Sequence, residues 1–161
     1  MATSVLILGL LGVAQLIPAS LVLSSGNRVS SAALVMAQQE MDQMVNQPLS
    51  MLSFLDTQHG LLTPLLLGDP TQPNVLVGSP IIMVNNLPLI DFSQDQVDGY
   101  SFNYVDPNDP GQATWDVRWA VSTTTNAVGS VVTAKRFIVG ARQIGGPNFV
   151  LPITLDTAVA N

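Results

Sequence analysis

Residues 5–17 read VLILGLLGVAQLI, and residues 29–47 read VSSAALVMAQQEMDQMVNQ. The first stretch is apolar except for two glycines and one glutamine, and no charged residue occurs before Arg28. A helix needs roughly 20 mostly apolar residues to cross a bilayer. We therefore predict an apolar helix over residues 1–28 that lies in a membrane or among similar helices, bent at Pro18 because proline removes a backbone hydrogen bond.

The second stretch predicts an amphipathic helix over residues 29–48 that continues the first. Its apolar side chains recur at three- and four-residue steps, which places them on one face of a helix. They are Leu34, Ala37, Met41, Met44 and Val45. Pro48 ends the helix, because the residue before a proline is pushed out of the α region. One apolar face needs one partner surface, which we expect to be the C-terminal part of the chain.

A cleaved signal peptide is the competing interpretation of the apolar start. Small residues at Ala19 and Ser20 would suit a cut by a signal peptidase. Signal peptides also carry a positively charged region first, and here no Lys or Arg precedes the apolar stretch. The sequence favours a retained helix and leaves cleavage open.

The rest of the chain predicts β-structure. Residues 49–113 contain many proline and glycine residues, which indicate an irregular connecting region with short strands. Residues 114–161 predict an antiparallel sheet, because apolar and other side chains alternate in its first segment with the period of a strand that has one buried face. The alternating apolar residues are Trp115, Val117, Trp119 and Val121. Val131–Ala141 predicts the return strand and Phe149–Leu155 a third strand.

The predicted fold class is therefore α+β. A long N-terminal helix, apolar in its first half and amphipathic in its second, would pack on one face of a small antiparallel sheet.

Composition narrows the possible functions of the chain. It has 161 residues, a formal net charge of −6 and only 10% charged residues, against about a quarter in typical soluble domains. Five basic residues cannot neutralise a phosphate backbone, so we expect no nucleic-acid partner. Cysteine is absent, which excludes disulfides and thiolate sites. With no nucleophile–base pair or phosphate loop, we predict no enzyme, no cofactor and no catalytic or metal-binding residue; a dispersed carboxylate pair stays open.

Three local features have two interpretations each. His59 is the only histidine, and without partners nearby in sequence it predicts a solvated loop side chain rather than a ligand. Asp106–Gly111 crowds oxygen ligands of the kind that Ca²⁺ binds, but the same residue types form ordinary tight turns, which we favour. Ser122–Thr125 could accept O-glycans if exposed.

The N-terminal third resembles the type IV pilins and the pseudopilins of type II secretion. Residues 5–16 resemble the apolar helix that follows the prepilin processing site, and residues 32–44 resemble the amphipathic continuation in minor pilins and minor pseudopilins. The processing site itself, a glycine followed by a Phe-(Ser/Thr)-Leu-Ile-Glu-like stretch, is absent. Either Met1 is an internal start, with the leader and the acidic residue encoded upstream, or this subunit lacks the acid.

The resemblance implies a structural subunit of a type IV pilus-like or pseudopilus filament. It implies the inner membrane as the location before assembly, an extracellular or periplasmic filament afterwards, and partners that include the chain itself, other pilin-like subunits, a prepilin peptidase and an assembly platform. The implied filament-core residues are Val5, Leu6, Leu8, Leu10, Leu11, Val13, Leu16 and Pro18. Helix-to-sheet packing would involve Leu34, Ala37, Met41, Met44, Trp115, Val117, Trp119 and Val121. The alternative is a membrane-tethered monomeric surface domain that binds a ligand or partner.

Overall fold

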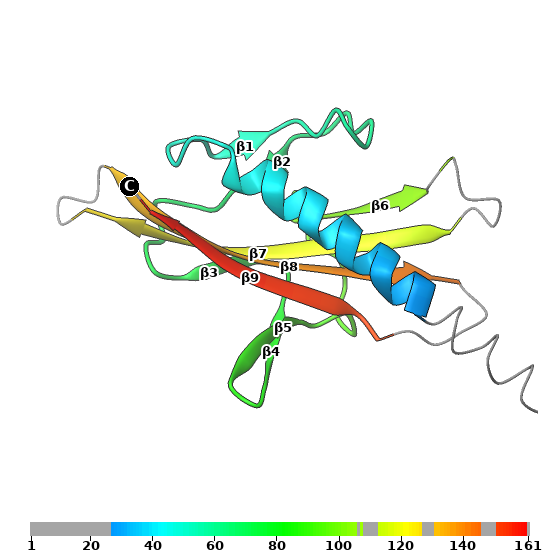
Figure 1. The fold of residues 1–161 in the computed structure, drawn as a ribbon. Helices are drawn as coiled ribbons and strands as arrows, with labels where there is room; N and C mark the ends of the chain where they lie inside the picture. The colour runs from blue at the N-terminus through cyan, green and yellow to red at the C-terminus, as the bar shows by residue number, and fades with distance from the viewer. Residues whose placement is uncertain (1–26, 106, 108–112, 127–130, 146–150, 161) are drawn as a thin grey trace, which may run out of the picture.

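A computed structural model describes residues 27–105, 107, 113–126, 131–145 and 151–160. These residues form one helix, at 27–45, and nine strands (Figure 1). The strands are β1 (Ser53–Phe54), β2 (Leu65–Leu66), β3 (Leu76–Gly78), β4 (Ile81–Val84), β5 (Leu87–Ile90), β6 (Ser101–Val105), β7 (Thr114–Thr125), β8 (Val132–Ile144) and β9 (Ile153–Ala160).

The main sheet has five antiparallel strands with β7 near its centre. Its order is β3-β7-β8-β9, and β6 also pairs with β7. Strands β6 and β3 lie end to end along one edge of β7, because β6 pairs with Thr114–Arg118 and β3 pairs with Ala120–Ser122. Strand β8 covers the whole of the other edge. Two further pairs, β1–β2 and β4–β5, form separate two-stranded sheets.

The helix crosses one face of the main sheet and buries its apolar stripe there (Figure 1). Alternation along β7 turns its tryptophan and valine side chains toward the helix, where they join apolar residues of β8. The buried members of this core from the helix, β7 and β8 are Ala33, Met36, Ala37, Met41, Met44, Trp115, Val117, Trp119, Val121, Phe137, Val139 and Ala141. Each fully buried large side chain contributes about 1.5–3 kcal/mol relative to exposure.

A second, smaller core lies on the opposite face of the sheet. It contains Ile90, Phe92, Ala120 and Ile138. Gly140 permits the close approach of Ile90, the last residue of β5. A Cβ atom built on Gly140 would lie 2.9 Å from Cβ and Cγ1 of Ile90. Both faces of β7 are therefore buried, whereas the sequence predicted only one buried face.

The β4–β5 hairpin projects from the sheet on the side of this second core (Figure 1). Its turn residues Asn85 and Asn86 have φ angles of 51° and 65°, as a two-residue type I′ turn requires. The pairing of Val84 with Leu87 closes the hairpin. The base of the hairpin packs on the main sheet at Ile90, whereas residues 82–87 at its tip are exposed.

The predicted fold class is wrong. The described chain is mainly β, with about 45% of its residues in strands, and it has one short helix rather than a long helix on a small sheet. The main sheet is larger than predicted because two short strands from the connecting region 49–113 pair with β7. They are Leu76–Gly78 and Ser101–Val105. The third strand begins at Ile153, later than predicted.

The predicted transmembrane helix and the helix-bundled polymer are also corrected. Within the ranges given above, no helix combines the length and the apolar character that a membrane crossing requires. Residues 1–26, which carry most of the predicted apolar helix, lie outside the described residues.

Candidate functional site

The predicted packing residues occupy different environments. Seven of the eight predicted helix-to-sheet residues lie in the large core; the exception is Leu34, which is 45% exposed. Every predicted filament-core residue, from Val5 to Pro18, lies outside the described residues. So does the Asp106–Gly111 turn, apart from Pro107. The segment proposed for O-glycans belongs to β7, and its Thr123 is fully buried.

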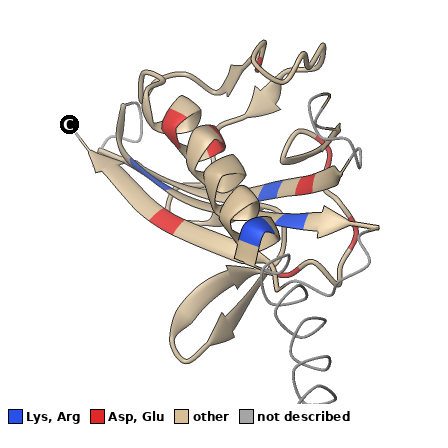
Figure 2. Ribbon diagram, turned by 45° about the vertical axis from the view of Figure 1, so that its right-hand side comes forward, with Lys and Arg blue, Asp and Glu red and all other residues tan. Residues whose placement is uncertain are grey.

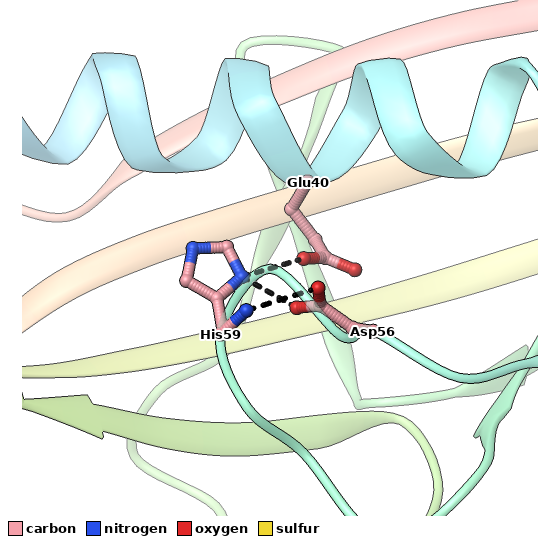
Figure 3. Close-up of side chains that lie close together, drawn as sticks. All are labelled: Glu40, Asp56 and His59. Atoms are coloured by element: carbon pink, nitrogen blue, oxygen red, sulfur yellow. Dashed lines mark hydrogen bonds and ion pairs between the residues drawn. The ribbon is translucent and has the colours of Figure 1, made fainter.

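Three ionisable side chains that are distant in sequence meet between the helix and the loop that joins β1 to β2 (Figure 3). Glu40 comes from the helix, and Asp56 and His59 come from the loop. One ligand atom from each lies within 4.8 Å of the others. We call this set the Glu40–Asp56–His59 cluster.

The whole cluster is removed from solvent. Glu40 and Asp56 are fully buried, and the side chain of His59 is only 4% exposed. The sequence interpretation of His59 as a solvated loop residue is therefore wrong. The His59 side chain is enclosed by Glu40 of the helix and by two aromatic rings of β6, which are distant in sequence, so local sequence does not reveal its burial.

Asp56 is oriented by the turn that follows it. Its Oδ1 accepts hydrogen bonds from the backbone N–H groups of Gln58, at 2.9 Å, and His59, at 3.2 Å. Its carbonyl oxygen accepts a further bond from the N–H of Leu61 at 3.0 Å. These bonds leave Oδ2 facing the imidazole, where it contacts Nδ1 of His59. Aspartate forms such turns readily because its short carboxylate reaches the backbone two residues on.

The imidazole of His59 packs on two aromatic rings of β6. The ring of Tyr104 meets it edge-on at a centroid distance of 4.8 Å, and that of Phe102 lies at 5.5 Å. Its Nδ1 is 3.8 Å from Oε2 of Glu40 (Figure 3), a charge contact too long for a hydrogen bond. The ring is thus held with Nδ1 facing both carboxyl groups.

Glu40 is the least satisfied member of the cluster. Both its carboxyl oxygens are buried and neither has a hydrogen-bond partner in the described structure. Burial first, and then the neighbouring Asp56 carboxylate, raises the pKa of Glu40 to about 8. An unpartnered buried polar group is destabilising by roughly 1–3 kcal/mol, so this position has a physical reason to attract a positively charged ligand.

The sequence contained a signal for Glu40. The residue follows Met36 and Ala37 by four and three positions and precedes Met44 by four, which places a carboxylate within the apolar stripe. The predicted apolar face, Leu34, Ala37, Met41, Met44 and Val45, did not include Glu40, although its position lies on that face.

A contrasting charged cluster lies on the opposite face of the sheet. Asp116 accepts two hydrogen bonds from Arg118, both at 2.9 Å, and others from Arg142 at 3.0 Å and Gln96 at 2.8 Å. Both guanidinium groups also lie over the ring of Phe92. Every carboxylate oxygen of Asp116 has partners, which marks this network as structural.

Comparison with models of protein families, with curated proteins and with solved structures finds no match. The resemblance to pilins therefore stays a prediction.

The geometry limits what the Glu40–Asp56–His59 cluster can do. A substrate cannot reach three side chains that are almost fully enclosed unless the loop between β1 and β2 moves. A proton or a single ion is small enough to occupy the space between their ligand atoms.

Proposed function

We propose that the chain is a structural subunit of a pilus-like or pseudopilus filament in the periplasm or outside the cell, joined to its neighbours through apolar surfaces of its folded part. The single observation that carries this proposal is the β4–β5 hairpin. It presents four large apolar side chains to solvent: Ile82 at 45%, Met83 at 62%, Val84 at 42% and Leu87 at 64% exposure.

The hairpin is unusual because no charged side chain lies among its exposed apolar ones. Residues 81–90 contain no charged residue, and Figure 2 shows the hairpin without acidic or basic positions. An isolated two-stranded hairpin is marginally stable in water, and an exposed apolar patch in a folded protein indicates an interaction site. Pro88 removes one backbone donor from β5, which disfavours growth of the hairpin by strand addition. The exposed apolar side chains of the hairpin are therefore the expected contact surface.

A second apolar surface lies on the outer side of the helix. Leu34 and Val35 are 45% and 55% exposed, and the helix covers the sheet face opposite to the second core, from which the hairpin projects. Two different patches on opposite sides of one molecule favour head-to-tail contacts, which continue into a filament when the rotation does not close a ring. This arrangement supports a filament subunit over a two-fold dimer.

The resemblance of residues 5–16 and 32–44 to pilins supports the same proposal. It adds other pilin-like subunits, a prepilin peptidase and an assembly platform as proposed partners.

Assembly of the full chain tests the proposal. We expect the unmodified protein to form species that sediment and appear as fibres by electron microscopy, and Met83→Asp to remain monomeric because it places a charge in the interface. Leu62→Asp is the matched control, since Leu62 is 93% exposed on the loop between β1 and β2 and should assemble normally. A wild-type protein that stays monomeric at every concentration would support the tethered surface domain instead.

A further inference from the structure

We propose that Glu40, Asp56 and His59 form a binding site for one divalent transition-metal ion, with Zn²⁺ as the best fit. The proposal is independent of filament assembly. It rests on the ligand types, on their distances and on the unpartnered carboxyl group that points into the cluster (Figure 3).

The ligand set is one imidazole nitrogen and two carboxylates. Zinc binds nitrogen and oxygen ligands at about 2.0–2.2 Å in tetrahedral geometry, which places ligand atoms about 3.3–3.6 Å from one another. The distance from Nδ1 of His59 to Oε2 of Glu40 is 3.8 Å, close to that spacing. Nδ1 and Oδ2 of Asp56 are already in contact, so an ion would replace the proton between them and separate the two atoms.

Glu40 supplies the second, independent observation. Its side chain is fully buried and directed at the other two ligands, and both of its oxygens lack a hydrogen-bond partner in the described structure. Asp116, equally buried, has its oxygens bonded to two arginines and a glutamine. The protein thus supplies partners to every oxygen of one buried carboxylate and none to those of Glu40, as expected if Glu40 binds a ligand. Metal binding displaces the protons that the ligand atoms hold, and the two carboxylates then balance the charge of a divalent ion.

The supporting contacts resemble those that orient metal ligands in general. Asp56 is fixed through Oδ1 by two backbone N–H groups, and the His59 ring is fixed by Tyr104 and Phe102. Such outer contacts hold ligands in the geometry that the metal requires. An ion bound here would connect the helix to the loop between β1 and β2.

The cluster fits zinc better than calcium or magnesium. Calcium takes six to eight oxygen ligands, whereas the cluster has four carboxylate oxygens and one of them is already used by the turn at Asp56. Imidazole favours zinc, cobalt, nickel and copper over calcium and magnesium. Three protein ligands leave one position of a tetrahedral zinc ion for a water molecule.

Metal binding can be measured on the full chain in mild detergent, carrying Met83→Asp so that assembly does not interfere. After treatment with a chelator, the protein is titrated with Zn²⁺ and, separately, with Co²⁺. We expect one equivalent of Zn²⁺ per chain, a melting temperature that rises with Zn²⁺ but not with Mg²⁺, and a visible absorption band from tetrahedral Co²⁺.

Variants then locate the site. Glu40→Gln and His59→Gln should each weaken Zn²⁺ binding by at least about tenfold and abolish the Co²⁺ band. Asp42→Asn is the matched control, because Asp42 is an exposed acid on the same helix and should leave binding unchanged. Equal binding by all variants would place the metal elsewhere and overturn the proposal.

The unmutated cluster also provides a test that does not depend on the folding of a variant. Failure of the chelator-treated protein to bind Zn²⁺, together with the absence of a Co²⁺ band, would overturn the proposal and leave the cluster as a proton-sharing network. Because binding is measured on the Met83→Asp monomer, neither result decides whether the wild-type chain forms filaments.

Discussion

Nδ1 of His59 lies 3.8 Å from Oε2 of Glu40, which joins a loop residue to a residue in the middle of the helix. The contact brings together a helix whose apolar stripe faces the sheet and a loop that runs over the aromatic side chains of β6. Of the groups in this contact, the Glu40 carboxyl group is the one whose buried oxygens have no hydrogen-bond partner in the described structure.

Replacement of Glu40 by methionine should stabilise the metal-free protein. The substitution removes two buried oxygens that lack partners and keeps a long side chain in the apolar stripe, so we expect the free energy of unfolding to rise by about 1–3 kcal/mol. Urea denaturation in the presence of a chelator measures the change. Asp42→Asn, on the exposed face, should stay within about 0.5 kcal/mol of wild type. A destabilised Glu40→Met would mean that the carboxyl group has a stabilising partner.

Loss of the Asp116 carboxylate should be strongly destabilising. Asp116→Asn leaves the buried guanidinium of Arg118 without its charge partner, and we expect a loss of about 3 kcal/mol or more. The matched variant Asp156→Asn breaks the surface pair with Arg136, whose side chain is 49% exposed, and should change stability by less than about 1 kcal/mol. Chemical denaturation of the two variants at neutral pH makes the comparison. Similar losses in both would contradict the structural role of the buried network.

Stability should rise with pH above about 8 because of Lys135. Burial lowers the pKa of Lys135 from 10.5 to about 8, although its ammonium group donates a hydrogen bond to the carbonyl of Met51. Between these two values the unfolded chain binds more protons than the folded one, so unfolding becomes less favourable as pH increases. We expect a gain of about 1–2 kcal/mol over that window, smaller than the full pKa difference implies because the hydrogen bond to the Met51 carbonyl favours the charged ammonium group.

The effect is isolated by comparison with Lys135→Met. The variant lacks the titrating group. The unfolding free energy of the wild type should therefore rise relative to that of the variant as pH increases from about 8 to 10.5. Denaturation midpoints at several pH values give this difference directly. Parallel curves for the two proteins would show that the lysine keeps its ordinary pKa.

Substitutions of Asn86, in the turn of the β4–β5 hairpin, should differ clearly in their effect on stability. Its φ of 65° suits glycine and asparagine, so Asn86→Gly should change stability by less than about 1 kcal/mol. Asn86→Val should destabilise the hairpin by about 1–2 kcal/mol, because a β-branched residue is strained at positive φ. Thermal unfolding measures both, and equal melting temperatures would contradict the type I′ turn.

The parts of the fold that local sequence patterns predicted are the long, periodic ones. The alternation of Trp115 and Val117 with Asp116 and Arg118 predicted the strand that became β7, since twelve residues of strand contain several periods. Short strands were predicted at Val75–Val77 and Ile81–Val84, close to β3 and at β4, but their pairing was not. Strand β6, of five residues, contains too few periods for a local signal and pairs with β7.

The cluster was missed for a related reason. Asp56 and His59 lie in a loop whose sequence is typical of an exposed turn, and their burial depends on the helix and on β6, which the chain reaches much later. Glu40 alone carried a local signal, the break in the apolar stripe of the helix. Long-range packing, rather than residue type, brought the three ligand atoms together.

The division of one edge of β7 between two short strands has a consequence for how the sheet opens. Fraying of β3 leaves the pairing of β6 in place, and the reverse also holds, so the amide protons of β7 should exchange with solvent in two blocks. The blocks meet at Trp119, whose N–H donates to the carbonyl of Tyr100 at 3.0 Å and whose carbonyl accepts from Ser79 at 2.9 Å. Its indole also donates to the carbonyl of Leu66 at 2.9 Å. Trp119 is thus the residue of β7 at which the pairing passes from β6 to β3, while β8 holds both blocks along the other edge.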